Sequence, residues 1–222
     1  GETFEVETAV FADATYRTSY GKFSFGIPRN AASAVSRMPD LGGSKLVSLE
    51  QDILTGGIVE AVYLLGDDTP IGLRYDAEYG MMKAAVSYHR LSDLDTNVFD
   101  LAIGYDTGRF FANGSLELVK PGATSSQSAI HVEIGASADH YEAGLGYTGG
   151  SNVVPDALMA WATYRPMDQL GVTATVLDVD GASTIYGLSG KYTVWQGAYV
   201  QAGVVDTTSS DALWDLSLGY QF

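Results

Sequence analysis

The chain has 222 residues, of which 46% are hydrophobic and 18% charged, and it contains no cysteine. Without cysteine there can be no disulfide framework, thiolate metal site or cysteine nucleophile. The formal net charge is −15 and only 12 residues are Lys or Arg, which argues against nucleic acid as a partner because phosphate binding needs clustered basic side chains. No run reaches the roughly 18–20 consecutive apolar residues of a membrane-spanning helix.

The N-terminal third predicts three short strands followed by a long interruption. Thr3 to Phe11 and Thr15 to Ser19 form one predicted hairpin, and Lys22 to Ile27 leads into the interruption. From Pro28 to Thr69 there is no strand pattern, and Pro39 and two glycine pairs break up the segment. Loops longer than about 12–15 residues are uncommon in compact domains and are usually functional or disordered. We therefore expect residues 28–69 to fold into the middle of a barrel and narrow it.

Eleven further strands are predicted after this segment. Asn97 to Thr107 and Ala129 to Ala138 show the pattern, with apolar and polar residues alternating along each stretch. A period of two is typical of strands with two different faces. The connections alternate between tight turns, as at Asp139-His140, and longer polar loops, as at Gly149 to Pro155. Transmembrane barrels have this asymmetry, with short periplasmic turns and longer outer loops.

Alternation alone does not say which face meets water, so a soluble β-sandwich or a lipocalin-like barrel is an alternative. Three features favour a membrane barrel. The strands have about 9–11 residues, the length that a tilted membrane strand needs. Aromatic residues recur near strand ends, as in an interfacial belt. The last strand ends on an aromatic residue, and its predicted lipid-facing residues are Trp214, Leu216, Leu218, Tyr220 and Phe222.

The predicted fold class is therefore all-β, a transmembrane antiparallel up-and-down β-barrel of about 14 strands. Residues 1–222 form one domain, with 28–69 as an inserted constriction loop. An even strand number places both termini on the periplasmic side and lets the first and last strands pair antiparallel.

Three short motifs carry a resemblance to a known family. They are Tyr20-Gly21-Lys22-Phe23-Ser24-Phe25-Gly26 before the long loop, Thr69-Pro70-Ile71-Gly72-Leu73-Arg74-Tyr75 after it, and the closing Leu218-Gly219-Tyr220-Gln221-Phe222. In this order they resemble Gram-negative general diffusion porins of the alphaproteobacterial, Rhodobacter-like type. The resemblance implies a trimer of 16-stranded barrels with the third outer loop folded inside. With about 14 predicted strands, either this barrel is smaller or the sequence begins partway into the protein.

A barrel of this size is too wide for its own side chains to fill, because eight-stranded barrels already reach that limit. Rows of opposite charge that face each other across the remaining passage would select which solutes pass. The resemblance implies that acids on the loop face basic residues on the wall. The predicted constriction residues are Asp40, Glu50 and Asp52 on the loop, and Arg17, Arg74, Lys83 and His89 on the wall. The alternative is that these are ordinary solvated charges of loop and lumen.

An enzyme is not expected. The three histidines show no zinc-ligand spacing, and no serine lies in a G-x-S-x-G setting. His131 and Glu133 share one strand face and are interpreted as lumen polarity. Loops at Asp206 to Asp211 and Asp67-Asp68 could hold Ca²⁺ through carboxylates and carbonyls, but neither has the spacing of a defined calcium loop, so no cofactor is predicted.

The predicted function is passive diffusion of small hydrophilic solutes and ions through a water-filled channel in the Gram-negative outer membrane, with a weak preference for cations. The six acids of residues 28–69 outnumber its three bases, Arg29, Arg37 and Lys45. The expected partners are membrane lipid, the permeating solutes and, from the resemblance, two further copies of the chain. The alternative is a non-conducting structural or partner-binding barrel of the outer membrane.

Overall fold

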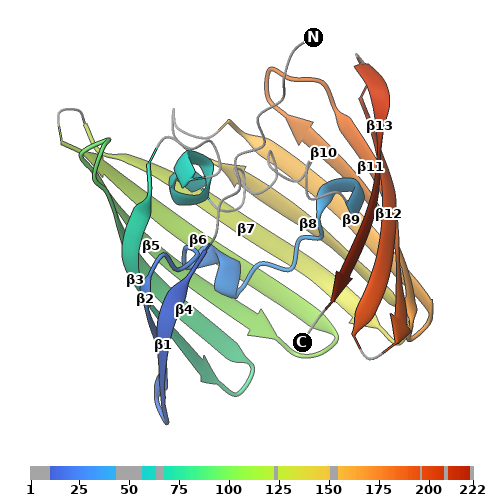
Figure 1. Cartoon of the computed structure of the whole chain (residues 1–222), viewed down its shortest axis with the longest axis horizontal. Coiled ribbons are helices and arrows are strands. Elements are labelled where there is room, and N and C mark those ends of the chain that lie inside the picture. Colours follow the sequence, from blue (N-terminus) through green and yellow to red (C-terminus); the bar gives the residue numbers. More distant parts are fainter. Residues whose placement is uncertain are drawn as a thin grey trace.

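The computed structural model describes residues 11–43, 57–63, 68–122, 125–150, 155–195, 197–207 and 210–220. Within these ranges, antiparallel strands join in chain order into one 13-stranded sheet. The sheet curls into a barrel wall (Figure 1). The strands are β1 (Asp13–Thr18), β2 (Gly21–Gly26), β3 (Pro70–Tyr79), β4 (Met82–Leu91), β5 (Thr96–Asp106), β6 (Phe110–Pro121), β7 (Gln127–Ala138), β8 (Tyr141–Gly149), β9 (Ala157–Met167), β10 (Leu170–Val179), β11 (Ile185–Trp195), β12 (Ala198–Thr207) and β13 (Ser210–Tyr220).

The predicted fold class is confirmed: the sheet is antiparallel and up-and-down, with each strand paired to its neighbours in sequence. Eleven strands, β3 to β13, follow the long segment, as the alternation predicted. Two of the three strands expected before it are present as β1 and β2. The first, expected at 3–11, lies outside the described residues except for Phe11.

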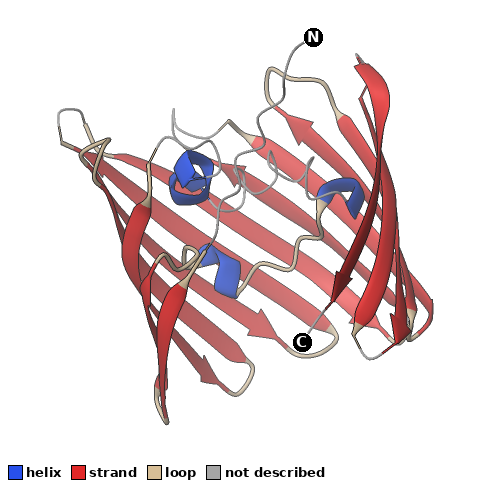
Figure 2. Cartoon of the chain, viewed as in Figure 1, coloured by secondary structure: helices blue, strands red, loops and turns tan. Residues whose placement is uncertain are grey.

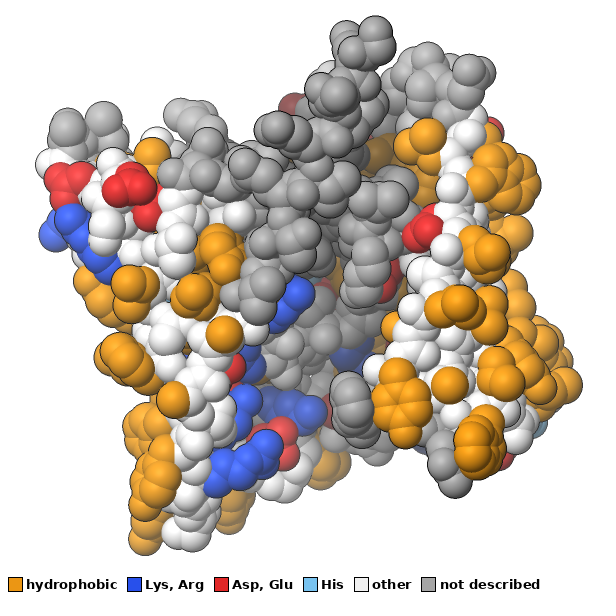
Figure 3. Space-filling view, viewed as in Figure 1, with side chains coloured by type: hydrophobic (Ala, Val, Ile, Leu, Met, Phe, Trp, Pro, Cys, Tyr) orange, Lys and Arg blue, Asp and Glu red, His pale blue; other side chains and the backbone are white. Residues whose placement is uncertain are grey.

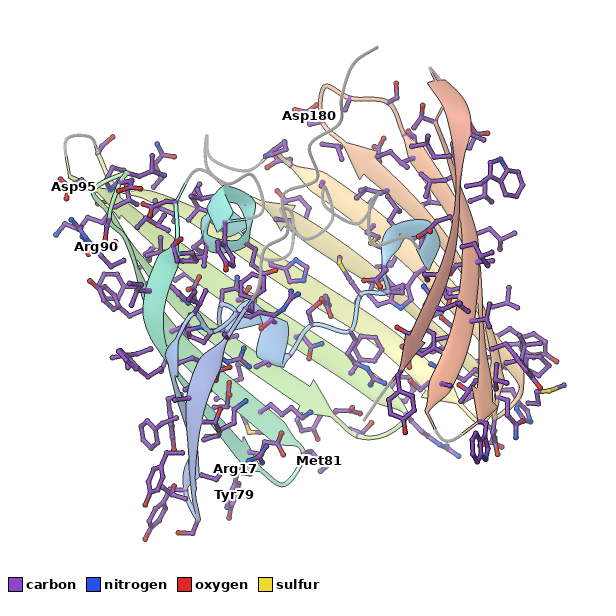
Figure 4. The ribbon with its side chains drawn as sticks, in the orientation of Figure 1. Arg17, Tyr79, Met81, Arg90, Asp95 and Asp180 are labelled. Carbon is purple, nitrogen blue, oxygen red and sulfur yellow. The ribbon has the colours of Figure 1, made fainter. Side chains whose placement is uncertain are left out.

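The two ends of the sheet differ as predicted. At the short-turn end, neighbouring strands are joined by two or three residues, as at 80–81, 107–109 and 139–140. Gly80 and Gly108 have φ of 60° and 81°, a left-handed backbone that glycine adopts without steric cost. The other, long-loop end carries Arg90, Asp95 and Asp180 (Figure 4).

The faces of the sheet are inverted relative to those of a water-soluble protein. On β5 and β6, Leu101 and Leu118 point outward and are about half exposed, whereas the inward Asp100 and Glu117 are buried. Hydrophobic side chains cover the outer surfaces of the wall in Figure 3. An apolar outer face and a polar inner face are the pattern of transmembrane β-barrels. None of the described helices is long and apolar enough to cross a membrane.

The last strand follows the same rule. Trp214, Leu216, Leu218 and Tyr220 are all more than half exposed, and the residues between them on β13 are less exposed. The alternation predicted for this strand is therefore present, although Phe222 lies outside the described residues.

The described parts of residues 28–69 lie on the concave face of the sheet (Figure 2). They contain two short 3-10 helices, η1 (Ala32–Ala34) and η2 (Leu41–Gly43), and a helical stretch at 57–63. Apolar clusters form where the segment meets the wall. Val35 packs with Ala102 of β5, Val59 with Val98 of β5, and Leu41 belongs to a cluster that includes Trp161. The buried apolar contacts therefore attach the segment to the inside of the wall, as the long-loop prediction required.

Candidate pore constriction

A buried carboxylate on β7 provides the central attachment of the segment. The Glu133 side chain has no exposed surface, and its Oε2 accepts the backbone N–H of Arg37 at 2.9 Å and the Nδ2 of Asn113 at 3.0 Å. Its Oε1 lies 2.7 Å from His131 Nε2 and also accepts the hydroxyl of Ser36. A buried charge is tolerated only when it is paired and hydrogen-bonded, so these contacts fix the segment and the wall to each other.

Two neighbouring strands repeat this arrangement. Both carboxylate oxygens of Glu117 on β6 lie 3.1 Å from the backbone nitrogen of Ile58. On β4 and β5, Ser87 donates its hydroxyl to Asp100 at 2.7 Å and accepts the backbone N–H of Ala31 at 2.9 Å. Acids on three adjacent strands thus bind backbone groups of the segment, directly or through one hydroxyl.

Arg37 of the segment also pairs with acids of the wall. Its guanidinium contacts Asp106 at 2.9 Å and Glu142 at 3.0 Å, and lies 4.5 Å from the ring centre of Phe111. Here the segment supplies the base and the wall supplies the acids, the reverse of the arrangement that the resemblance implied. Elsewhere in the segment, Arg29 pairs with Glu60 at 2.9 Å.

Three of the predicted wall bases come together. Arg17, Arg74 and Lys83 line one cavity of about 510 Å³ on the inner side of β1 to β4. Arg74 also holds the segment, because one of its terminal nitrogens donates to the Asn30 carbonyl at 3.1 Å and to the Ser33 hydroxyl at 2.7 Å. Figure 4 shows Arg17 at the short-turn end, beside the β3–β4 turn.

The other predicted constriction residues lie elsewhere. His89 is fully buried beneath the start of the segment, with Nε2 2.9 Å from the Pro28 carbonyl, so its ring contacts the segment rather than open space. Asp40 lines a second cavity of about 370 Å³, next to strands β8 to β12. Glu50 and Asp52 lie outside the described residues. The structure therefore groups the wall bases and places Asp40 in a different cavity.

The second cavity has a more balanced lining. Arg37, Arg165 and Lys191 contribute positive charge, and Asp40, Glu142 and Asp168 contribute negative charge. Most of the remaining lining residues have hydroxyl or amide side chains, including Thr163, Thr173, Ser189, Thr193 and Gln201. Both cavities are thus polar and lie on the inner side of the wall, which suits hydrated solutes.

The acidic loops considered for Ca²⁺ are only partly described. Asp67 and residues 208–209 lie outside the described residues. The carboxylate of Asp68 accepts the backbone N–H groups of Thr69 at 2.7 Å, Asp93 at 2.8 Å and Leu94 at 3.1 Å. Both of its oxygens thus already serve as acceptors for a loop connection at the long-loop end.

Comparison with known proteins identifies the fold. No family model and no curated protein match the chain. Solved structures do match: a double mutant of the Rh. blastica porin aligns with a TM-score of 0.73 and a triple mutant of the Rhodopseudomonas blastica porin with 0.72. A structure described as "Asymmetric conductivity of engineered proteins" also aligns with a TM-score of 0.72. Each of these three structures is 16% identical in sequence to this chain. Each alignment covers 94% of this chain and 75% of the other chain.

The chain therefore has the fold of a bacterial porin, an outer-membrane type of β-barrel. The resemblance read from the three sequence motifs is confirmed at the level of the fold.

Proposed function

We propose that this chain forms a water-filled channel in the Gram-negative outer membrane, through which small hydrophilic solutes and ions diffuse passively. The observation that supports this most strongly is the inverted sheet with a segment anchored on its polar inner face. A wall of this kind presents apolar side chains to lipid and leaves a polar interior. The anchored segment would narrow the interior without filling it, since both polar cavities remain beside it.

We further propose a weak preference for cations. The support is the net charge of −15 of the whole chain, because the summed charge of a protein sets the potential around it and so attracts counter-ions. The bases Arg17, Arg74 and Lys83 oppose this preference locally. The selectivity should therefore be small and should decrease as salt rises, because the Debye length falls from about 10 Å at 0.1 M to about 3 Å at 1 M.

A planar lipid bilayer tests both parts of the proposal. The refolded protein should give stepwise increases in current whose size grows with salt concentration. The reversal potential across a KCl gradient should have the sign of K⁺ preference. A folded protein that inserts and passes no current would instead favour the non-conducting structural or partner-binding barrel, and a clear preference for Cl⁻ would contradict the selectivity.

The proposed assembly is a homotrimer, on the likeness to porins alone. Outward aromatic pairs such as Phe23 with Tyr75 and Tyr88 with Phe99, whose ring centres are 4.6 and 4.9 Å apart, could pack against lipid or against another barrel. Light scattering in mild detergent should give three times the mass of the chain. A monomer would contradict the trimer and leave the channel proposal intact.

A further inference from the structure

The cavity on the inner side of β1 to β4 concentrates positive charge in an acidic chain. Four of the 12 Lys and Arg residues line it, and its acids are Asp76 and Glu78, a local excess of two positive charges (four minus two). The four bases are Arg17, Lys22, Arg74 and Lys83. Blue side chains gather in the lower part of the hollow in Figure 3. The net charge of the whole chain is −15, so this cavity has the opposite sign.

The acids of the cavity leave part of this charge without a close partner. Asp76 forms ion pairs with both Lys22, at 2.9 Å, and Arg74, at 2.6 Å. Lys83 approaches Glu78 only to 3.8 Å, and both side chains are more than half exposed, so this pair contributes little. The Arg17 side chain makes no hydrogen bond or ion pair within the part of the chain that the structure describes.

The strand register makes this arrangement unfavourable by itself. Arg17 and Lys22 are direct cross-strand partners of β1 and β2, which sets two positive charges opposite each other on one face. Like charges in that position destabilise a sheet. An anion placed between them would remove the repulsion and use the free donors of both side chains.

We propose that this cavity is a binding subsite for small multivalent oxyanions of the phosphate class, at the short-turn mouth of the channel. The guanidinium of Arg17 presents a planar set of donors that matches phosphate oxygens, and Lys22 and Lys83 add point charges. The volume of about 510 Å³ is within the range of roughly 300–1,000 Å³ for small-molecule sites.

The anion would come from solution rather than from a lipid headgroup. Ser33 and Ala34 of the inserted segment form one side of the cavity, so it opens into the lumen, whereas the hydrophobic side chains that would face lipid lie on the opposite face of the sheet. The subsite rests on the proposed function, because dissolved anions reach it through a water-filled lumen. The positive charge of the subsite is confined to one mouth of the channel. A channel that favours K⁺ overall can therefore still bind phosphate there.

Calorimetric titration with inorganic phosphate tests the subsite on the refolded chain in neutral detergent at low salt. The wild type should bind phosphate with an affinity that falls as salt rises. Arg17→Gln should weaken binding about tenfold, the loss expected for one charge-assisted hydrogen bond. Arg17 is exposed and has no described partner, so this variant should keep its circular dichroism spectrum.

Arg165→Gln is the matched control, because it removes the same charge from the second cavity. It should leave phosphate binding unchanged. No binding by the wild type, or an equal loss in the two variants, would overturn the subsite.

A bilayer measurement separates the subsite from the channel itself. Added phosphate should lower the wild-type conductance more than that of Arg17→Gln. A protein that conducts and shows no phosphate binding in the titration would keep the channel and overturn the subsite. A protein that binds phosphate with the predicted dependence on Arg17 and passes no current would support the subsite and overturn the channel.

Discussion

Glu133 and Arg37 lie 96 positions apart in the sequence, and the buried carboxylate of the first accepts the backbone N–H of the second at 2.9 Å. This contact lies between two other attachments of the segment. Before it, the Ala31 N–H binds Ser87 of β4, and after it, the Gly43 carbonyl accepts the side-chain amide of Gln201 on β12. Residues 31–43 therefore cross the inside of the wall from β4 to β12 with Glu133 as an intermediate support (Figure 1).

Replacing Glu133 by Gln should loosen the segment. The amide keeps one acceptor oxygen, and its NH₂ group would face donors, so the contacts to Arg37, Asn113, His131 and Ser36 could not all remain. Loss of one hydrogen bond to a buried charged group costs about 1.5–3 kcal/mol. We expect faster tryptic cleavage after Arg37 and larger current fluctuations in a bilayer.

Glu78→Gln is the control for this variant, because Glu78 is exposed and makes only a 3.8 Å contact with Lys83. It should behave as the wild type in both assays. Equal protease resistance of Glu133→Gln and the wild type would contradict the role of Glu133 as an anchor.

Gly203→Ala should displace η2 from the wall. A Cβ at Gly203 would overlap the carbonyl oxygen of Gly42, and that contact is with backbone, which cannot rotate away. Gly190→Ala, one strand away on β11, would meet nothing within 4 Å. We therefore expect the first variant to raise single-channel conductance and the second to leave it unchanged. If the two variants conduct equally, η2 does not rest on β12 in the folded channel.

The last strand tests the lipid-facing assignment. Leu216 is 72% exposed on the outer face, and the neighbouring Ser217 points inward. Arg at a lipid-facing midplane position costs about 2–4 kcal/mol. Leu216→Arg should therefore sharply reduce folding into lipid vesicles, measured by circular dichroism, whereas Ser217→Arg should be tolerated. Similar folding yields for the two variants would show that β13 does not present this face to lipid.

The fold could be predicted because its main signals are local. Period-two alternation sets the faces of each strand, and the alternation of tight and long connections gives the up-and-down order. The sequence also indicated that the apolar face points outward, since strand length and aromatic residues near strand ends favour a membrane barrel over a soluble one. These signals predicted β3 to β13 and the inward course of the segment.

The constriction was harder to predict because it depends on where the segment crosses the wall. His131 and Glu133 were interpreted as lumen polarity, and the structure shows them buried under residues 36–37. One signal was available: Asp100 and Glu117 are opposite each other across β5 and β6, a like-charged pair that needs compensating donors. Reading that signal requires the strand register, which the sequence alone leaves open.

Single-channel conductance of the wild type and of a variant lacking residues 36–49 tests most directly whether this chain is a channel narrowed from within. The deletion removes the Arg37 attachment and η2, and residues 44–49 lie outside the described part. We expect the wild type to conduct and the deletion variant, shown to be folded by circular dichroism, to conduct more. Equal conductance of the two folded proteins would contradict this expectation, because the segment would then not obstruct the passage.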